Sequence, residues 1–161
     1  MKRYIVAFLG IAMLITYGVT AGAAEWKTNF AEATTNAVKS GKYMLVDFSG
    51  SDWCGWCMKL DEEVFSKPEF ATFAKKNLIC VSIDFPRTKT QTPELKAQNS
   101  ALAQKYTIQG FPTVLIMSPE GELVATTGYQ DGGAKKYVES LQKMIADHKQ
   151  KPKFKAQDAK K

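Results

Sequence analysis

The pentapeptide Trp53-Cys54-Gly55-Trp56-Cys57 decides the fold, because it lies where an apolar segment ends and an amphipathic segment begins. Upstream, Tyr43-Met44-Leu45-Val46-Asp47-Phe48 is short, apolar and bounded by glycine and serine residues, which is typical of a buried strand. Downstream, residues 57–65 place apolar side chains at helical spacing with charged side chains opposite them. The sequence therefore predicts a strand-loop-helix unit with two cysteines at the start of the helix.

Cys54 and Cys57 can close a small disulfide ring when the first lies at a helix N-terminus and the second lies one turn later. The free backbone N–H groups and the positive end of the helix dipole favour a thiolate at Cys54. In Cys-x-x-Cys motifs this lowers the pKa of the thiol from about 8.5 to roughly 3.5–7.5. We therefore expect a reactive pair with an oxidised and a reduced state.

The first 24 residues have the pattern of a secretory signal, with a charged start and an apolar run over residues 5–15. Small residues follow at 21–24, and the small-x-small rule allows cleavage after Ala23 or after Ala24. The alternative is a retained N-terminal anchor, although the apolar run is shorter than the ~20 residues of a spanning helix. We expect residues 1–24 to be removed and the protein to be periplasmic or secreted.

Composition indicates one domain, over residues 25–148. Three cysteines are too few for a disulfide scaffold, and a chain of this length can build a hydrophobic core without one. Removing the two basic residues of the signal reduces the formal net charge from +6 to +4. Much of the remaining excess lies in residues 149–161, which we expect to be a solvated, disordered basic tail and not a nucleic-acid site.

Helical and strand patterns alternate through this domain. A helical pattern over residues 26–40 precedes the strand, and the cysteine helix is interrupted at Pro68, where a second helical piece starts. Further strands are predicted at 78–84, 113–117 and 122–126, and further helices over 93–106 and 133–148. Strands joined by helices require a parallel centre, and the turn at 118–121 adds an antiparallel hairpin. The predicted fold class is α/β, with a central mixed β-sheet, helices on both faces and a C-terminal hairpin followed by a helix.

Three segments in this order resemble the thioredoxin family over roughly residues 43–146. Val46-Asp47-Phe48 is similar to the strand before the family's active site, residues 53–57 to its redox motif, and Gly110-Phe111-Pro112-Thr113 to its cis-proline loop. The resemblance implies a thioredoxin-like fold and an exported oxidoreductase that reduces or isomerises protein disulfides. It implies no cofactor beyond a redox-active disulfide formed by the two cysteines of the motif.

The resemblance also implies roles for individual residues. Cys54 would attack the substrate, Cys57 would resolve the mixed disulfide, and Asp47 would move protons to and from Cys57. A carboxyl group in an apolar strand should have a raised pKa, which suits this role. The alternative for Asp47 is a strand-end carboxylate that reaches water or a loop N–H group.

Substrate contact is expected from four residues around the cysteines. The resemblance implies that Pro112 is cis and that Phe111 lines a substrate groove, and proline is the only residue for which a cis peptide bond costs little. The alternative is a trans proline at the start of a strand. Trp53 is expected to pack under the active-site loop. Trp56 lies between the cysteines and should be partly exposed.

Two features depart from the family pattern. The spacer Ser49-Gly50-Ser51-Asp52 is one residue longer than usual. Cys80 lies where many relatives have a lysine close to the buried acid. Cys80 is either a small apolar core residue or a group that tunes the redox pair.

The expected partners are disulfide-containing proteins and a membrane electron-transfer protein, and the chain is expected to be a monomer. Two alternatives remain open. One is a non-catalytic thioredoxin-fold binding or chaperone module. The other is metal handling by the two thiolates, for which the ligand count is poor because His148 is the only histidine.

Overall fold

A five-stranded mixed sheet, ordered β1-β3-β2-β4-β5, forms the centre of the computed structural model, which describes residues 23–150. The strands are β1 (Trp26–Lys27), β2 (Tyr43–Ser49), β3 (Leu78–Asp84), β4 (Thr113–Met117) and β5 (Leu123–Thr127). β1 and β2 run parallel to β3, whereas β4 runs antiparallel to both β2 and β5. The predicted fold class is confirmed. The predicted signal and tail lie outside the described residues, apart from residues 23–24 and 149–150.

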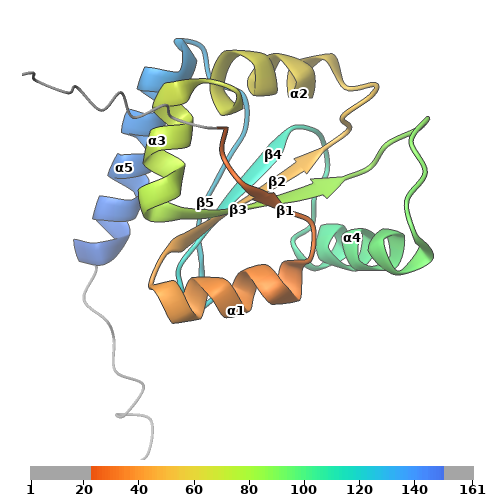
Figure 1. The fold of residues 1–161 in the computed structure, drawn as a ribbon, viewed down its shortest axis with the longest axis horizontal. Coiled ribbons are helices and arrows are strands. Elements are labelled where there is room, and N and C mark those ends of the chain that lie inside the picture. The colour runs from red at the N-terminus through yellow and green to blue at the C-terminus, as the bar shows by residue number, and fades with distance from the viewer. Residues whose placement is uncertain (1–22, 151–161) are drawn as a thin grey trace, which may run out of the picture.

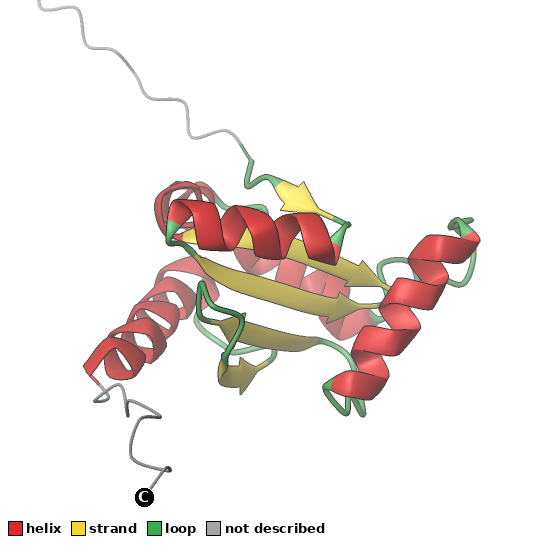
Figure 2. Ribbon diagram, turned by 90° about the horizontal axis from the view of Figure 1, so that it is seen from below, coloured by secondary structure: helices red, strands yellow, loops and turns green. Residues whose placement is uncertain are grey.

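Helices cover both faces of this sheet (Figure 1, Figure 2). One face carries α1 (Phe30–Ser40) and α4 (Pro93–Lys105). The other carries α2 (Gly55–Leu60), the π-helical turn η1 (Asp61–Phe65), α3 (Pro68–Asn77) and α5 (Gly133–Gln150). None of the helices within residues 23–150 is both long enough and apolar enough to span a bilayer.

Strand β2 is buried along its whole length because it lies between β3 and β4 and is covered on both faces. Met44, Val46 and Phe48 point toward α1 and α4, while Tyr43 and Leu45 point toward α3 and α5. By this alternation Asp47 faces the side that α2 and η1 cover. The strand thus carries its one acidic side chain to the underside of the cysteine helix.

Local signals in the sequence set the helix ends. The Asn29 side chain accepts a hydrogen bond from the Glu32 N–H and caps α1, which ends at Gly41 with a φ of +66°. Pro68 and Pro93 occupy the first turns of α3 and α4, where the missing N–H group is no loss. The break at Pro68 and the start at Pro93 are confirmed.

The prediction of a helix from residue 26 was wrong at its start. Trp26 belongs to β1, which pairs with β3, and its ring packs against Phe65 and Phe70. Val38 is one of the apolar residues at helical spacing in residues 26–40, yet in α1 it is 61% exposed. At the other end of the chain, α5 continues to Gln150, two residues beyond the predicted end.

Candidate active site

The two cysteines lie where β2 leads into α2, as predicted. Cys54 is the N-cap of α2, and its Sγ accepts a hydrogen bond of 3.2 Å from the backbone N–H of Cys57. The two sulfur atoms are bonded to each other. The helix terminus thus already directs a donor at the atom that would carry negative charge after reduction.

Exposure is similar for the two cysteines, at 7% for Cys54 and 5% for Cys57. Burial therefore does not distinguish an attacking from a resolving sulfur. The surroundings of the two sulfur atoms differ, because Cys57 lines a pocket beneath α2 and Cys54 does not. Beside them, Trp56 is 58% exposed, which confirms the prediction of an exposed ring.

The Phe111–Pro112 peptide bond is cis, as predicted. The Phe111 ring meets the Trp53 ring edge-on, with 5.8 Å between the ring centroids. Trp53 in turn donates its indole N–H to the carbonyl oxygen of Phe85 at 2.7 Å. A Cβ atom on Gly50 would collide with the Trp53 ring, so the close packing under the active-site loop requires glycine there. These contacts join the redox motif to the cis-proline loop.

Trp56 packs on the other side of the motif, against Tyr129 at 5.1 Å between ring centroids. The Lys59 ammonium group lies 5.1 Å from the Trp56 ring centroid and 4.9 Å from that of Tyr129. The Tyr129 hydroxyl group donates to Glu63 at 2.6 Å. Tyr129 was not predicted from the sequence, because it follows β5 and has no local pattern that ties it to the cysteines.

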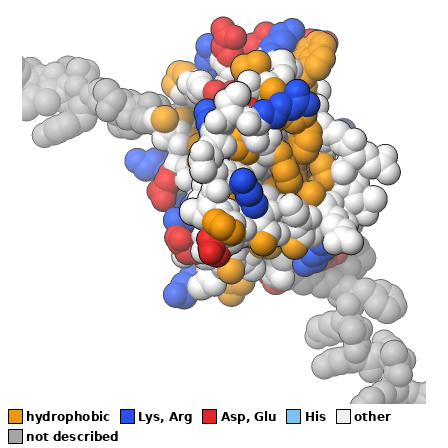
Figure 3. Space-filling model, turned by 90° about the vertical axis from the view of Figure 1, so that its right-hand side faces the viewer, with side chains coloured by type: hydrophobic (Ala, Val, Ile, Leu, Met, Phe, Trp, Pro, Cys, Tyr) orange, Lys and Arg blue, Asp and Glu red, His pale blue; other side chains and the backbone are white. Residues whose placement is uncertain are grey.

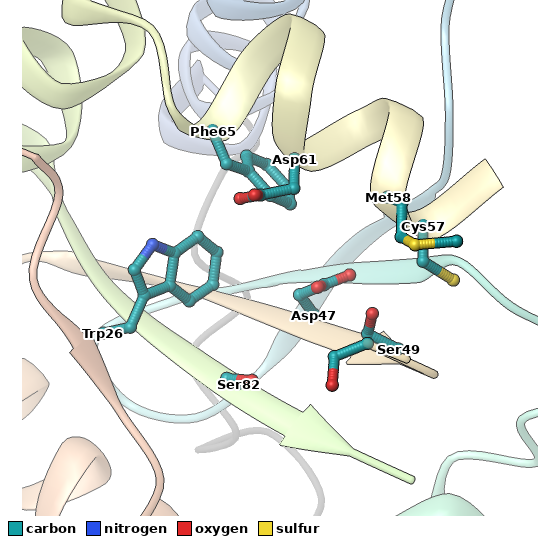
Figure 4. A pocket seen from close by; sticks show the side chains of 9 residues that line it. Trp26, Asp47, Ser49, Cys57, Met58, Asp61, Phe65 and Ser82 are labelled. Carbon is teal, nitrogen blue, oxygen red and sulfur yellow. The ribbon is translucent and has the colours of Figure 1, made fainter. Parts of the chain in front are cut away.

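Asp47 lies in a pocket of about 320 Å³ between α2, η1 and strands β2 and β3 (Figure 4). The side chain is 8% exposed, and its Oδ1 atom has no hydrogen-bond partner among the described residues. Burial raises the pKa of Asp47 to about 7, and the charges of Asp61 and Asp84 also raise it. Since Cys57 lines the same pocket, a proton could pass between the two groups directly or through water.

No basic side chain lines this pocket within the described part of the chain. Cys80 is 2% exposed and packs in the core with Leu45 and Leu78. Burial raises the pKa of the Cys80 thiol to about 12, and the charge of Asp47 adds to the effect. Both observations favour the interpretation of Cys80 as a core residue.

The longer spacer before the motif has a structural role that the sequence did not reveal. Its last residue, Asp52, accepts hydrogen bonds from the backbone N–H groups of Arg87, Thr88 and Lys89. The hydroxyl group of Thr88 also donates to Asp52, and this bond, followed by the backbone bonds, holds the pKa of Asp52 well below its usual range. The partners lie more than 30 positions away, beyond the reach of any local pattern.

Within residues 23–150, no group of three His, Cys, Asp or Glu side chains is placed to hold a metal ion. His148 lies in the last turns of α5, where Nδ1 is 2.9 Å from the Tyr43 hydroxyl oxygen and Nε2 is 3.5 Å from a Glu122 oxygen. His148 therefore lies at the opposite end of β2 from Cys54 and Cys57.

Comparison with known proteins points in the same direction as this geometry. A family model for the thioredoxin-like domain matches residues 30–145. Disulfide bond reductase DsbH of Chlamydia pneumoniae is 32% identical over 130 residues, which cover 81% of this chain and 78% of that protein. Thioredoxin-related protein DsbJ of the same organism is 34% identical over 95 residues, 59% of this chain and 27% of that protein.

Solved structures agree with this. A structure described as DsbH oxidoreductase superposes with a TM-score of 0.78 at 31% identity and covers 85% of this chain and 94% of its own. A thioredoxin from Thermus thermophilus superposes with a TM-score of 0.61 at 19% identity, covering 78% and 90%. At that identity the second likeness concerns the fold alone.

Proposed function

This chain belongs to the thioredoxin-like family, and on that premise we propose that it is an exported thiol-disulfide oxidoreductase that reduces protein disulfides through Cys54 and Cys57. The observation that carries the proposal is the bonded cysteine pair at the start of α2, with the buried acid Asp47 in the pocket that Cys57 lines. The name of its relative, a disulfide bond reductase, favours reduction over isomerisation.

The first step starts from the reduced pair. The Cys54 thiolate attacks one sulfur of the substrate disulfide, so that a bond forms between Cys54 and the substrate while the substrate's own S–S bond breaks. The departing substrate sulfur leaves as a thiolate and takes a proton from water. The backbone N–H of Cys57, which donates to the Cys54 sulfur, favours the thiolate before the attack.

The second step uses the pocket beneath α2. Cys57 gives its proton to the Asp47 carboxylate, and the resulting thiolate attacks the sulfur of Cys54. The second substrate thiolate departs and takes up a proton, and the Cys54–Cys57 disulfide re-forms. Two electrons have then passed from the enzyme to the substrate.

Further turnover requires two electrons from a dithiol donor, because an oxidising compartment does not keep thiols reduced. We assign this task to a membrane electron-transfer protein. The exposed Trp56 ring and the Phe111–Pro112 loop are the surfaces that we assign to the substrate.

Two measurements on the purified chain test the proposal. With dithiothreitol as electron source, the wild type should accelerate insulin reduction, and the Cys54→Ser, Cys57→Ser double variant should not. Equilibration with glutathione should place the potential nearer that of thioredoxin, about −270 mV, than that of a dedicated oxidant, about −120 mV. A chain that binds unfolded proteins without reducing insulin would be a binding module instead, and a potential near the oxidant value would reverse the direction of electron flow.

A further inference from the structure

The longer spacer before the motif and the loop after β3 form one structural unit. Asp52, the last residue of the spacer, accepts hydrogen bonds from the backbone N–H groups of Arg87 at 2.9 Å, Thr88 at 2.7 Å and Lys89 at 3.2 Å. From the loop side, the Lys89 ammonium group donates to the hydroxyl group of Ser51 at 3.1 Å. The Thr88 hydroxyl group also donates to Asp52, so five hydrogen bonds hold residues 87–89 against the active-site spacer.

This arrangement places a cation at the rim of the active site. The guanidinium carbon of Arg87 lies 4.0 Å from the centroid of the Trp53 ring, a cation–π distance. Trp53 directly precedes Cys54, and its ring also touches Phe111 of the cis-proline loop. Arg87 is thus held beside the proposed substrate groove, on the side that Trp53 and Phe111 form.

The positive charge of Arg87 has no paired carboxylate among the described residues. No carboxylate of residues 23–150 lies within 4.0 Å of its guanidinium group. The nearby carboxylate of Asp52 is already occupied by backbone N–H groups. On the other side of the motif, by contrast, Lys59 lies 3.8 Å from Glu63. Figure 3 shows this end of the molecule, where hydrophobic side chains gather between Lys and Arg side chains.

We propose that Arg87 is a specificity residue that binds an acidic side chain next to the cysteine of a substrate protein. The inference rests on the proposed function, since it names the kind of substrate that the same site prefers. An exposed ion pair at a rim contributes modestly and is weakened by salt. It should act on KM and leave the chemical step unchanged.

The test uses three short peptides, each joined through its single cysteine to a chromophoric thiol and identical except for Glu, Gln or Lys on both sides of that cysteine. With dithiothreitol as electron source and its uncatalysed rate subtracted, release of the chromophore gives kcat and KM at low and high salt. The variant is Arg87→Gln. The matched control is Lys149→Gln, which removes a cation lying over an aromatic ring, that of Tyr43, at the opposite end of β2.

The wild type should reduce the Glu peptide with a kcat/KM about three- to fivefold above that for the Gln peptide, through KM and at low salt only. Arg87→Gln should lose this preference and keep the wild-type rate on the Gln peptide, while Lys149→Gln should behave like the wild type. An unchanged preference in Arg87→Gln, or an equal loss in Lys149→Gln, would overturn the inference and leave the proposed function intact. Failure of the wild type to reduce any of the peptides would instead remove the function, and the inference with it.

Discussion

At the scale of single residues, Asp47 has the most unusual environment of the site. Its carboxyl group is buried on a mostly apolar strand, and the charges of two further acids, Asp61 and Asp84, act on it. A pKa of about 7 means that the group is part protonated near neutral pH, which is the state that proton exchange with Cys57 requires.

The raised pKa of Asp47 gives the stability of the fold a pH dependence. Between its ordinary value of 3.8 and about 7, the folded chain holds a proton that the unfolded chain has lost. Stability then falls with rising pH by about 1.4 kcal/mol per unit across that window. Asp47→Asn has no such loss, so its stability relative to the wild type should rise by about 2–3 kcal/mol between pH 5 and pH 8. Urea denaturation of the oxidised proteins measures this difference, and parallel pH profiles would contradict it.

Asp61 contributes to this shift, because its charge lies on the wall of the same pocket and disfavours the ionised form of Asp47. Asp61→Asn should therefore lower the pKa of Asp47 and move the stability profile toward lower pH. NMR titration of the Asp47 carboxyl carbon checks the direction. Glu62→Gln is the control, since Glu62 is the next residue along η1 but does not line the pocket. Equal shifts in both variants would mean that the general charge of η1 is responsible.

Cys80 should be redox-inert, because it is buried in the core with a pKa raised to about 12 and so stays a thiol near neutral pH. Cys80→Ala should change the equilibrium constant of the Cys54–Cys57 couple with glutathione by less than about twofold. It should still lower the stability of the fold, because a buried sulfur atom is lost. A clear change in the equilibrium constant would restore the idea that Cys80 tunes the pair.

The sequence predicts some of these residues and misses others for physical reasons. Asp47 could be predicted because an acid within an apolar strand stands out locally. Asp61 was counted among the charged residues opposite the apolar side of its helix. Asp61 lies four positions after Cys57, which places the two side chains on the same face of the helix, and both line the pocket.

At the scale of elements, the unit formed by β2, the spacer and α2 positions the chemistry. Local patterns predicted this unit, because side chains alternate between two faces along a strand and recur every three to four residues along a helix. The contact between the spacer and the loop after β3 could not be predicted, since it depends on β2 and β3 being neighbours in the sheet. For the same reason the sequence did not predict that Trp26 belongs to a strand, since β1 forms only by pairing with β3.

Asp52 should control the order of the loop after β3. In Asp52→Ala the N–H groups of Arg87, Thr88 and Lys89 lose their acceptor, so their amide hydrogen exchange should become faster. Exchange measured by NMR resolves these three amides individually. Asp147→Ala in α5 is the control. If the three amides exchanged at the wild-type rate, the hydrogen bonds to Asp52 would not be what orders the loop.

At the scale of the whole molecule, a mixed sheet with helices on both faces was predictable because connection rules leave few ways to join these elements. Parallel strands need crossovers, and the short turn at 118–121 permits only a hairpin, so the order of patterns leads to a mixed sheet. Export, the electron donor and the monomeric state remain proposals, since they concern residues outside 23–150 or partners of the chain.

The different roles of the two sulfur atoms are tested most directly by trapping the mixed disulfide. Cys57→Ser, once reduced, should attack a disulfide substrate and stop, and mass spectrometry should show the substrate bound to Cys54 and released by dithiothreitol. Cys54→Ser should trap little or none, because Cys57 lies beneath the helix in the pocket with Asp47. Equal trapping by both variants, or trapping through Cys57 alone, would contradict the assignment of attack to Cys54 and resolution to Cys57.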